Sequence, residues 1–345
     1  MQAIRINPAP EGETPYSPTN PAPSTALANA KIPIPKPTSP TDLLIKIKAS
    51  TIIRDMLTWP EYYHQEYTIP GHDFSGTVAA IFEGDSDTPH NFKIGDEVFG
   101  MANATRASTW AEYAIVSVDE VALKPRTLGW EEAAALPLSA QTAYEALFGH
   151  AGIASLVSGS GGEPGKRENA SCRRVLITGA SGGVGVYLVQ LAASAGVHVV
   201  AASSSNARNG EFLRELGVDE VIEYADLEGE NGVFDVIIDC VGGDVLFKCW
   251  GSVKEDGVLI SVDSASFDFV AEHQKLGLRD GKEKVKASFF IVQGSGEVLN
   301  ALASLVDSGA LRSFVAATFP IDSVQEAYDF ANGRFDGRGK VVLTI

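Results

Sequence analysis

The chain has 345 residues, of which 45% are hydrophobic and 21% charged, and this composition suffices for two hydrophobic cores. Its formal net charge of −17 repels nucleic-acid phosphates and anionic lipids, and no apolar run reaches the roughly 18 residues that cross a bilayer. Three cysteines cannot form a disulfide framework. We therefore expect a cytoplasmic protein that acts on a small molecule and binds neither nucleic acid nor membrane.

The first third of the chain predicts a compact, mostly antiparallel β domain. Ten of the 17 prolines lie between Pro8 and Pro40. Because proline fixes φ and lacks an N–H donor, this stretch is expected either to run extended between two early strands or to be disordered. Short apolar runs separated by turns then predict strands at residues 42–50, 74–82, 96–100 and 111–117.

A change of pattern near residue 125 marks a second domain. Residues 130–148 have helical spacing of apolar side chains, and acids stand near their start. Residues 155–174 are rich in Gly, Ser and charge, which predicts a flexible loop. From Val175 apolar strands alternate with helices, a pattern typical of a parallel sheet covered by helices. Two later helices and a closing strand at residues 340–345 complete the prediction.

A glycine-rich turn follows the strand "RVLIT" and predicts a dinucleotide-binding site. Residues 179–185 read GASGGVG, which fits the pattern G-x-G-x-x-G with Ala180 in the first glycine's place. Gly182 would let the backbone approach a pyrophosphate at the N-terminus of the next helix. Gly185 would let that helix pack close to the strand. No Gly-Lys-Ser/Thr follows, so the turn is not a P-loop.

The choice of cofactor depends on the turn after the next strand. A site for NAD usually carries an acid there, which binds the ribose hydroxyls. Residues 203–208 instead read SSSNAR, and hydroxyls with a guanidinium would bind a 2′-phosphate. This turn predicts NADPH as the cofactor. The alternative is an ordinary solvated turn in which Arg208 pairs with Glu211 or Glu215.

Together these motifs resemble the medium-chain dehydrogenase/reductase superfamily, within it the zinc-independent quinone oxidoreductase-like and enoyl reductase-like enzymes. The resemblance covers nearly the whole chain and rests on six blocks in order: IPGHDFSGTV (69–78), IGDEVFG (94–100), EEAAALPLSAQTAYEAL (131–147), VLITGASGGVG (175–185), DVIIDCVGG (235–243) and GRGKVVLTI (337–345). It implies an α/β fold, a Rossmann doubly wound parallel sheet plus a GroES-like, mostly β catalytic domain, and a homodimer.

The resemblance also implies domain boundaries. The GroES-like domain would comprise residues 1–124, with a Pro-rich insertion at about 8–40, and would be completed by residues 293–345. The Rossmann domain would comprise residues 125–292, with the flexible loop at about 155–174.

A set of cofactor-binding residues follows from the same resemblance. Gly182, Gly183 and Val184, with Ala180 and Gly185 of the same turn, would hold the pyrophosphate. Ser203, Arg208 and Tyr224 would surround the 2′-phosphate. Leu138 and Thr142 would lie near the nicotinamide, and Cys240, Val241 and Gly242 would line its ribose. Phe290 to Val292 would meet the carboxamide. Lys340 would be a basic residue near the pyrophosphate.

A zinc site is not expected. Zinc-dependent relatives use three protein ligands, and this chain keeps only His72 of them, with Ile53 where the first ligand would align. The cysteines lie at positions 172, 240 and 249, all in the Rossmann half. Without a metal to polarise an alcohol, hydride delivery to an already electrophilic quinone or enone is the expected chemistry.

The substrate wall is the least determined part of the prediction. Relatives often carry NPVD where this chain has IRDM at residues 53–56, and the run that follows supplies Trp59 and His64 among other side chains. We expect Arg54, Asp55, Tyr62 and Tyr63 to face the substrate, where a tyrosine or histidine could protonate an enolate. The alternative is that the tyrosines are half-buried packing groups and that Arg54 and Asp55 form a surface ion pair.

Besides the reverse reaction, a dehydrogenase that produces the double bond and against which the preference for NADPH speaks, three functions remain open at this point. The first is an NADPH-dependent, zinc-free reductase of enones or quinones. The second is a trans-acting enoyl reductase on carrier-bound acyl chains, which would need a basic docking surface that this acidic chain offers little of. The third is a non-catalytic NADPH-binding regulatory protein, an alternative that the altered stretch at residues 53–56 keeps open.

Overall fold

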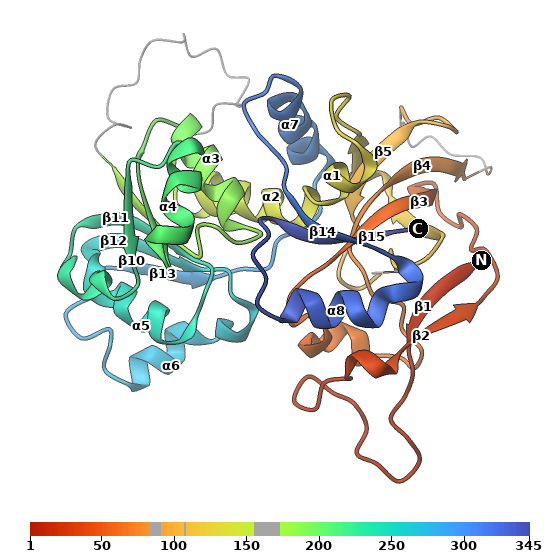
Figure 1. The fold of residues 1–345 in the computed structure, drawn as a ribbon, viewed down its shortest axis with the longest axis horizontal. Coiled ribbons are helices and arrows are strands. Elements are labelled where there is room, and N and C mark those ends of the chain that lie inside the picture. Colours follow the sequence, from red (N-terminus) through yellow and green to blue (C-terminus); the bar gives the residue numbers. More distant parts are fainter. Residues whose placement is uncertain (83, 85–90, 107, 155–172) are drawn as a thin grey trace. The chain divides into compact units, whose positions relative to one another are not determined.

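The computed structural model describes residues 1–82, 84, 91–106, 108–154 and 173–345, and these form two compact units. The first unit comprises residues 1–141 and 293–345, and the second comprises residues 142–292 (Figure 1). The expected flexible loop at 155–174 lies, except for its last two residues, outside the described part of the chain.

The second compact unit begins at Thr142, 17 residues after the boundary expected at residue 125. The reason is packing. Helix α1 (Trp130–Ala134) lies against strands β3 (Asp42–Ile52) and β4 (Asp73–Ile81) of the first unit. The long helix expected at 130–148 is also broken, because Pro137 lacks an N–H donor and starts the new helix α2 (Pro137–Tyr144). A π-helical turn (Glu145–His150) follows.

The first unit is built on a seven-stranded sheet of order β14-β15-β3-β4-β5-β7, with β6 paired to β3. All pairs in it are antiparallel except β14 with β15. Alternate residues of β3, Leu43, Ile45 and Ile47, are buried in one core cluster, as the two-residue period of a strand requires. The remaining elements of this unit are β5 (Glu97–Met101), β6 (Tyr113–Ser117), β7 (Val121–Leu123), α7 (Gly296–Asp307), β14 (Val315–Pro320), α8 (Val324–Asn332) and β15 (Lys340–Thr344).

The proline-rich stretch is not a single extended segment between strands. Strands β1 (Gln2–Ile6) and β2 (Leu27–Lys31) pair antiparallel, and β2 forms within the stretch. Residues 24–32 contain no proline, so every backbone N–H needed for the ladder is present. The backbone N–H of Ala22 donates to the hydroxyl of Tyr63 at 3.0 Å, which ties the segment before β2 to the two short 3-10 helices Met56–Thr58 and Pro60–Tyr63.

The second unit contains a six-stranded parallel sheet of order β10-β9-β8-β11-β12-β13. The first strand of the unit lies in the middle, and the chain moves outward on one side and then on the other. This is the order of a doubly wound dinucleotide-binding fold. The elements in chain order are β8 (Arg174–Thr178), α3 (Gly185–Ser194), β9 (His198–Ser203), α4 (Asn206–Glu215), β10 (Glu220–Glu223), β11 (Phe234–Asp239), α5 (Gly243–Ser252), β12 (Val253–Ser261), α6 (Phe269–Lys275) and β13 (Lys286–Phe289).

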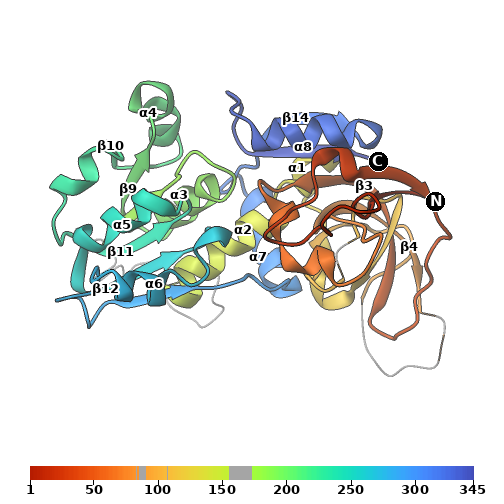
Figure 2. The same ribbon diagram turned by 90° about the horizontal axis from the view of Figure 1, so that it is seen from below.

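Helices cover this sheet on both faces. Leu246 and Trp250 of α5 and Phe269 of α6 form one core cluster with strand residues such as Leu176 and Ile237. Helix α4 lies on the other side of the sheet from α6 (Figures 1 and 2). The doubly wound parallel sheet and the separate, mostly antiparallel β unit of the predicted fold class are both confirmed.

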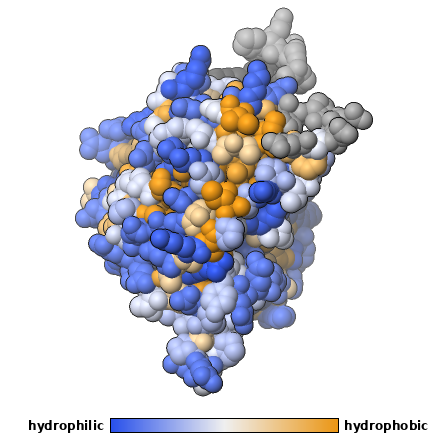
Figure 3. Space-filling view, turned by 90° about the vertical axis from the view of Figure 1, so that its right-hand side faces the viewer, coloured by the Kyte–Doolittle hydropathy of each residue, from blue (hydrophilic) through white to orange (hydrophobic). Residues whose placement is uncertain are grey.

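The surface is mostly hydrophilic on the face that Figure 3 shows, and hydrophobic side chains gather there in a band. The first unit exposes a few large apolar side chains, among them Ile34 and Ile94. Within the described residues no helix is long and apolar enough to cross a membrane.

Candidate functional site

The direction of winding reverses between β8 and β11, and the predicted pyrophosphate turn lies at this point. Ligands of doubly wound sheets bind outside the carboxyl ends of the strands at such a reversal. A Cβ placed on Gly179, just after β8, would lie 3.1 Å from the Cβ of Cys240 and 3.1 Å from Cγ2 of Val241, just after β11. The structure thus brings together two segments that the sequence assigned to different parts of one cofactor.

The glycines of the turn differ in what their environment allows. A Cβ on Gly185 would lie 2.2 Å from the carbonyl oxygen of Gly179 and 2.6 Å from Cα of Ala180, so the expected close packing is confirmed. Gly182 is exposed, and the nearest atom to a Cβ there would be the Gly179 oxygen at 3.1 Å. Gly183 and Val184, both partly exposed, lead directly into α3, where helix geometry leaves backbone N–H groups for an anion.

A buried carboxylate, Asp239, organises this edge of the sheet and was missed in the sequence. It stands at the end of β11 and is fully buried. It accepts hydrogen bonds from the hydroxyls of Thr178 (2.6 Å) and Ser261 (3.0 Å) and from the backbone N–H groups of Val241 (3.3 Å) and Gly242 (2.9 Å). Burial raises the pKa of Asp239, and these hydrogen bonds lower it. The carboxylate therefore fixes the loop predicted to line the ribose against two neighbouring strands.

The hydroxyl of Tyr224 reaches the glycine-rich turn. It accepts a hydrogen bond from the backbone N–H of Gly179 at 3.1 Å. Burial raises the pKa of Tyr224 to about 12, so its hydroxyl is protonated at neutral pH and keeps a proton to donate. Tyr224 follows β10, and its backbone N–H donates to the carbonyl oxygen of Ser203 at 3.3 Å. Tyr224 and Ser203, which the resemblance grouped together, are neighbours.

The two remaining members of the predicted 2′-phosphate group differ in exposure. Ser203 is buried, and its hydroxyl oxygen accepts from the backbone N–H of Ser205 at 3.3 Å. Arg208 is exposed in the first turns of α4. Of this pair, only the guanidinium is accessible to a ligand.

The residues expected around the nicotinamide lie on two elements. Leu138, partly exposed, and Thr142, buried, are one turn apart on α2. Phe290 follows β13 and stacks on the ring of His150 with 4.2 Å between centroids. Next to it Ile291 is 65% exposed, and Val292 is partly buried. The roles of these residues in binding the nicotinamide stay predictions.

A second buried carboxylate, Asp73, holds the start of α2. Its Oδ1 accepts from the backbone N–H of Leu138 at 2.6 Å, and its Oδ2 accepts from the hydroxyl of Thr51 at 2.6 Å. Nζ of Lys340 lies 3.3 Å from the same Oδ2, and both side chains are buried. The predicted pyrophosphate-binding lysine is therefore an ion-pair partner within the first unit. Asp73 follows His72 in the GHDF block, but nothing local in the sequence pointed to its partners.

Beside this pair, His72 has both ring nitrogens engaged. Its Nε2 lies 2.6 Å from the hydroxyl of Tyr62, and its Nδ1 lies 3.3 Å from the carbonyl oxygen of Ala102. Burial lowers the pKa of His72 to about 4, so the ring is neutral, donating through Nδ1 and accepting from Tyr62.

The predicted substrate wall uses most of its polar groups within the protein. Tyr62 is buried, and burial raises the pKa of its hydroxyl well above the usual value. The Tyr63 hydroxyl donates to the carbonyl oxygen of Leu57. Arg54 donates from Nη2 to the carbonyl oxygen of Gly333 at 2.6 Å, and the backbone N–H of Asp55 donates to Oδ1 of Asn332 at 2.7 Å. The packing alternative fits the tyrosines, whereas Arg54 and Asp55 are exposed and anchored to the end of α8.

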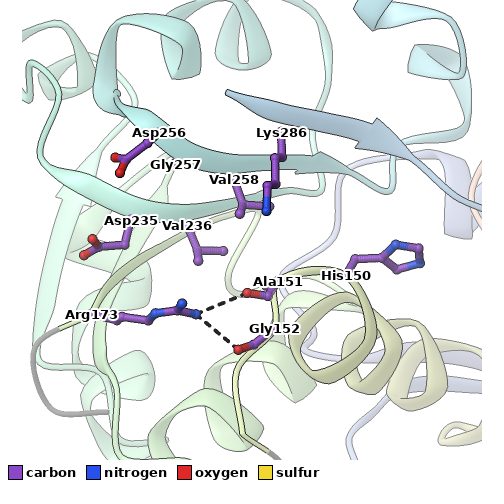
Figure 4. Close-up of a pocket in the computed structure, with 10 residues that line it drawn as sticks. All are labelled: His150, Ala151, Gly152, Arg173, Asp235, Val236, Asp256, Gly257, Val258 and Lys286. Carbon is purple, nitrogen blue, oxygen red and sulfur yellow. Dashed lines mark hydrogen bonds between the residues drawn. The ribbon is translucent and has the colours of Figure 1, made fainter. Parts of the chain in front are cut away.

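An open cavity of about 320 Å³ lies at the opposite edge of the parallel sheet, where the strands begin (Figure 4). Arg173, Asp235 and Lys286 line it, and Arg173 donates to the carbonyl oxygens of Ala151 (3.3 Å) and Gly152 (3.2 Å). Because nucleotides bind at the carboxyl ends of such strands, this cavity is not the dinucleotide site.

Known proteins share both units of the chain. "Alcohol dehydrogenase GroES-like domain" matches residues 39–126, and "Zinc-binding dehydrogenase" matches residues 216–343. The chain is 32% identical over 335 residues to "Probable zinc-binding oxidoreductase, mitochondrial" of Arthroderma benhamiae, with 94% of each chain covered. It is 31% identical over 302 residues to human "NAD(P)H oxidoreductase RTN4IP1, mitochondrial", covering 80% of this chain and 70% of that one. The solved quinone oxidoreductase of Coxiella burnetii has 27% identity and a TM-score of 0.80, and 100% of this chain and 99% of that one are covered.

The chain belongs to the medium-chain dehydrogenase/reductase superfamily. Within it the chain falls in the zinc-independent quinone oxidoreductase-like branch, as the motifs indicated. This medium-chain dehydrogenase/reductase is an oxidoreductase. Two of the relatives carry the word mitochondrial in their names, and the cytoplasmic location expected from composition stays a prediction.

Zinc appears in the names of the matching family and of one relative, but the side chains of this medium-chain dehydrogenase/reductase differ from those of a zinc site. Catalytic zinc takes three protein ligands, usually His, Cys or a carboxylate. His72 already uses both nitrogens, and Asp73 is held by Lys340 and Thr51. In the described part of the chain no three such side chains converge on one point. These residues do not fit a zinc ion.

Proposed function

We propose that the chain is an NADPH-dependent reductase that delivers hydride to a quinone or an enone without a metal ion. The observation that carries the choice of cofactor is the turn after β9, which presents the exposed guanidinium of Arg208 where an NAD site presents an acid. The printed names of two relatives, one an NAD(P)H oxidoreductase and one a quinone oxidoreductase, support the same class.

The residues at the carboxyl edge of the sheet suit a bound dinucleotide. Gly182 leaves its backbone open to a pyrophosphate, and Asp239 holds the loop of Cys240, Val241 and Gly242 in place. The nicotinamide supplies a hydride when bound. Asp73 caps α2 through the Leu138 N–H and so fixes the helix on which Leu138 and Thr142 stand.

The proposal for the acceptor follows from the donor set. Since His72 and Asp73 are engaged with other protein groups, they do not polarise an alcohol through a metal, and an acceptor that is already electrophilic needs only to be oriented. The hydroxyls of Tyr62 and Tyr63 are both engaged within the protein, so neither is assigned as proton donor. A small-molecule substrate and a homodimer remain part of this proposal.

Absorbance at 340 nm, followed with NADPH or NADH and a panel of quinones, enones and enoyl thioesters, tests the proposal. We expect turnover with NADPH to exceed turnover with NADH, and the best acceptor defines the substrate class. Arg208→Ala should lower kcat/KM for NADPH about tenfold and leave NADH unchanged, since one exposed charge-assisted hydrogen bond is lost. Arg214→Ala, at the far end of α4, is the matched control.

Preference of the unaltered protein for NADH would overturn the role given to Arg208. Tight NADPH binding without turnover of any acceptor would contradict an enzymatic function and favour a non-catalytic NADPH-binding protein.

A further inference from the structure

The edge of the sheet that should meet the adenosine ribose contains an acid that does not come from β9. Strands β9 and β10 pair in parallel register with Glu223 opposite Ser203, so both strands end side by side. Oε1 of Glu223 accepts a hydrogen bond from the backbone N–H of Asn206 at 2.8 Å. Asn206 is the first residue of α4 and belongs to the SSSNAR turn itself.

The position of this carboxylate bears directly on an incoming phosphate. The N–H groups at the start of a helix are the usual place for an anion, and here Glu223 already uses one of them. Further contacts fix the arrangement. Nδ2 of Asn206 donates to the carbonyl oxygen of Val221 at 3.4 Å, and the backbone N–H of Glu223 donates to Oδ2 of Asp226 at 3.2 Å.

We propose that Glu223 supplies from β10 the acid that β9 lacks, and that it limits the preference of this site for a 2′-phosphorylated cofactor. The inference rests on the proposed function, because it assumes that the adenosine ribose lies at the turn after β9. The carboxylate repels a 2′-phosphate that approaches the Asn206 N–H, and it accepts a hydrogen bond from a free 2′-hydroxyl. Arg208 and Glu223 therefore act in opposite directions on the same ribose substituent.

The site is thus a balance of one exposed cation and one acid. It predicts measurable use of both cofactors by the unaltered protein. Removing the acid should convert this mixed preference into a strong one for NADPH.

Binding of 2′,5′-ADP and 5′-AMP, measured by isothermal titration calorimetry on the full chain, tests the proposal without requiring turnover. The two probes differ only in the 2′-phosphate. Glu223→Gln keeps an oxygen that accepts from Asn206, so the turn retains its hydrogen bond. We expect the ratio of the two affinities to shift about tenfold toward 2′,5′-ADP in this variant.

Glu228→Gln is the matched control. It removes the same charge five residues further on, in the connection between β10 and β11, where Glu228 is exposed and lies 3.1 Å from Nζ of Lys248. It should leave the affinity ratio within about twofold of the unaltered protein.

Each outcome decides a different point. A ratio unchanged by Glu223→Gln, or shifted equally by Glu228→Gln, overturns the role of Glu223 while the dinucleotide site stands. Failure of both nucleotides to bind the unaltered protein and the variant overturns the cofactor site itself, and this inference with it.

Discussion

Two buried carboxylates, Asp73 in the first unit and Asp239 in the second, are accommodated in different ways. Asp73 has a countercharge, because Nζ of the buried Lys340 lies 3.3 Å from Oδ2. Asp239 accepts from four neutral donors, two hydroxyls and two backbone N–H groups. Burial without compensation is costly for any carboxylate. Asp73 is compensated by a cation and two neutral donors, and Asp239 by four neutral donors.

The difference predicts how each region responds to loss of one partner. When Lys340 is removed, Asp73 keeps the Leu138 N–H and the Thr51 hydroxyl as donors but loses this countercharge. A set of four donors keeps three when one is removed. Removal of one partner should therefore lower the free energy of unfolding more at Asp73 than at Asp239, and the following predictions test this contrast.

Lys340→Met should have the largest effect, because it leaves the Asp73 carboxylate buried beside an apolar side chain. We expect a loss of about 3–5 kcal/mol in the free energy of unfolding, measured by urea denaturation. Lys124→Met is the control. The side chain of Lys124 is only 8% exposed, but its partner Glu97 is 57% exposed and returns to water, so the loss should be clearly smaller. Equal losses in the two variants would remove the special status of the Asp73 pair.

Acid should affect the Asp73 region through His72. The pKa of His72 in the folded chain is about 4, against 6.5 as its ordinary value. As pH falls, the unfolded chain binds the proton first, so stability is lost from about pH 6.5 down to about 4, by about 3 kcal/mol at the end of that range. His72→Gln should remove this part of the pH dependence, and His64→Gln, at an exposed position, should not. Parallel pH profiles for His72→Gln and the unaltered protein would contradict the buried neutral ring.

Thr178→Val should have the smallest effect of the three. It removes the 2.6 Å hydrogen bond to Asp239 and the one that the same hydroxyl accepts from the Cys240 N–H at 3.1 Å. We expect a loss of about 1–3 kcal/mol in urea denaturation, and less for Ser261→Ala, which removes a single bond of 3.0 Å. A loss as large as that of Lys340→Met would show that neutral donors are no more replaceable than a cation.

Local chemistry explains what the sequence predicted well. The GASGGVG turn, the helix after it and the apolar strands around it are set by residues close to one another in the chain, and the structure contains them. Gly185 illustrates the point, because a side chain at this position would clash with Gly179 and Ala180, which lie a few residues before it in the sequence.

The two carboxylates were missed because their partners are distant in the sequence. Asp239 meets Thr178, and Asp73 meets Leu138 and Lys340, contacts that only the folded chain creates. One signal was available, since an acid that ends an apolar strand, as in FDVIID, needs partners for its buried charge.

The substrate wall shows the opposite difficulty. The run RDMLTWPEYYHQEY looks polar enough for a surface. Yet Met56, Leu57 and Tyr62 are buried in one cluster with Val324 of α8. Tertiary packing decided which aromatic side chains face inward, and no periodicity in that short irregular stretch could reveal it.

The place of β15 in the first sheet has a consequence for synthesis on the ribosome. Val341 pairs with Ile52, and β15 stands between β14 and β3, so the whole second unit is translated between two neighbouring strands. Chains emerge from their N-terminal end, and domains fold as their residues become available. The second unit can close while translation continues, whereas the first must wait with an unfilled sheet edge, and with Asp73 lacking its cation, until the codons for residues 340–344 have been read.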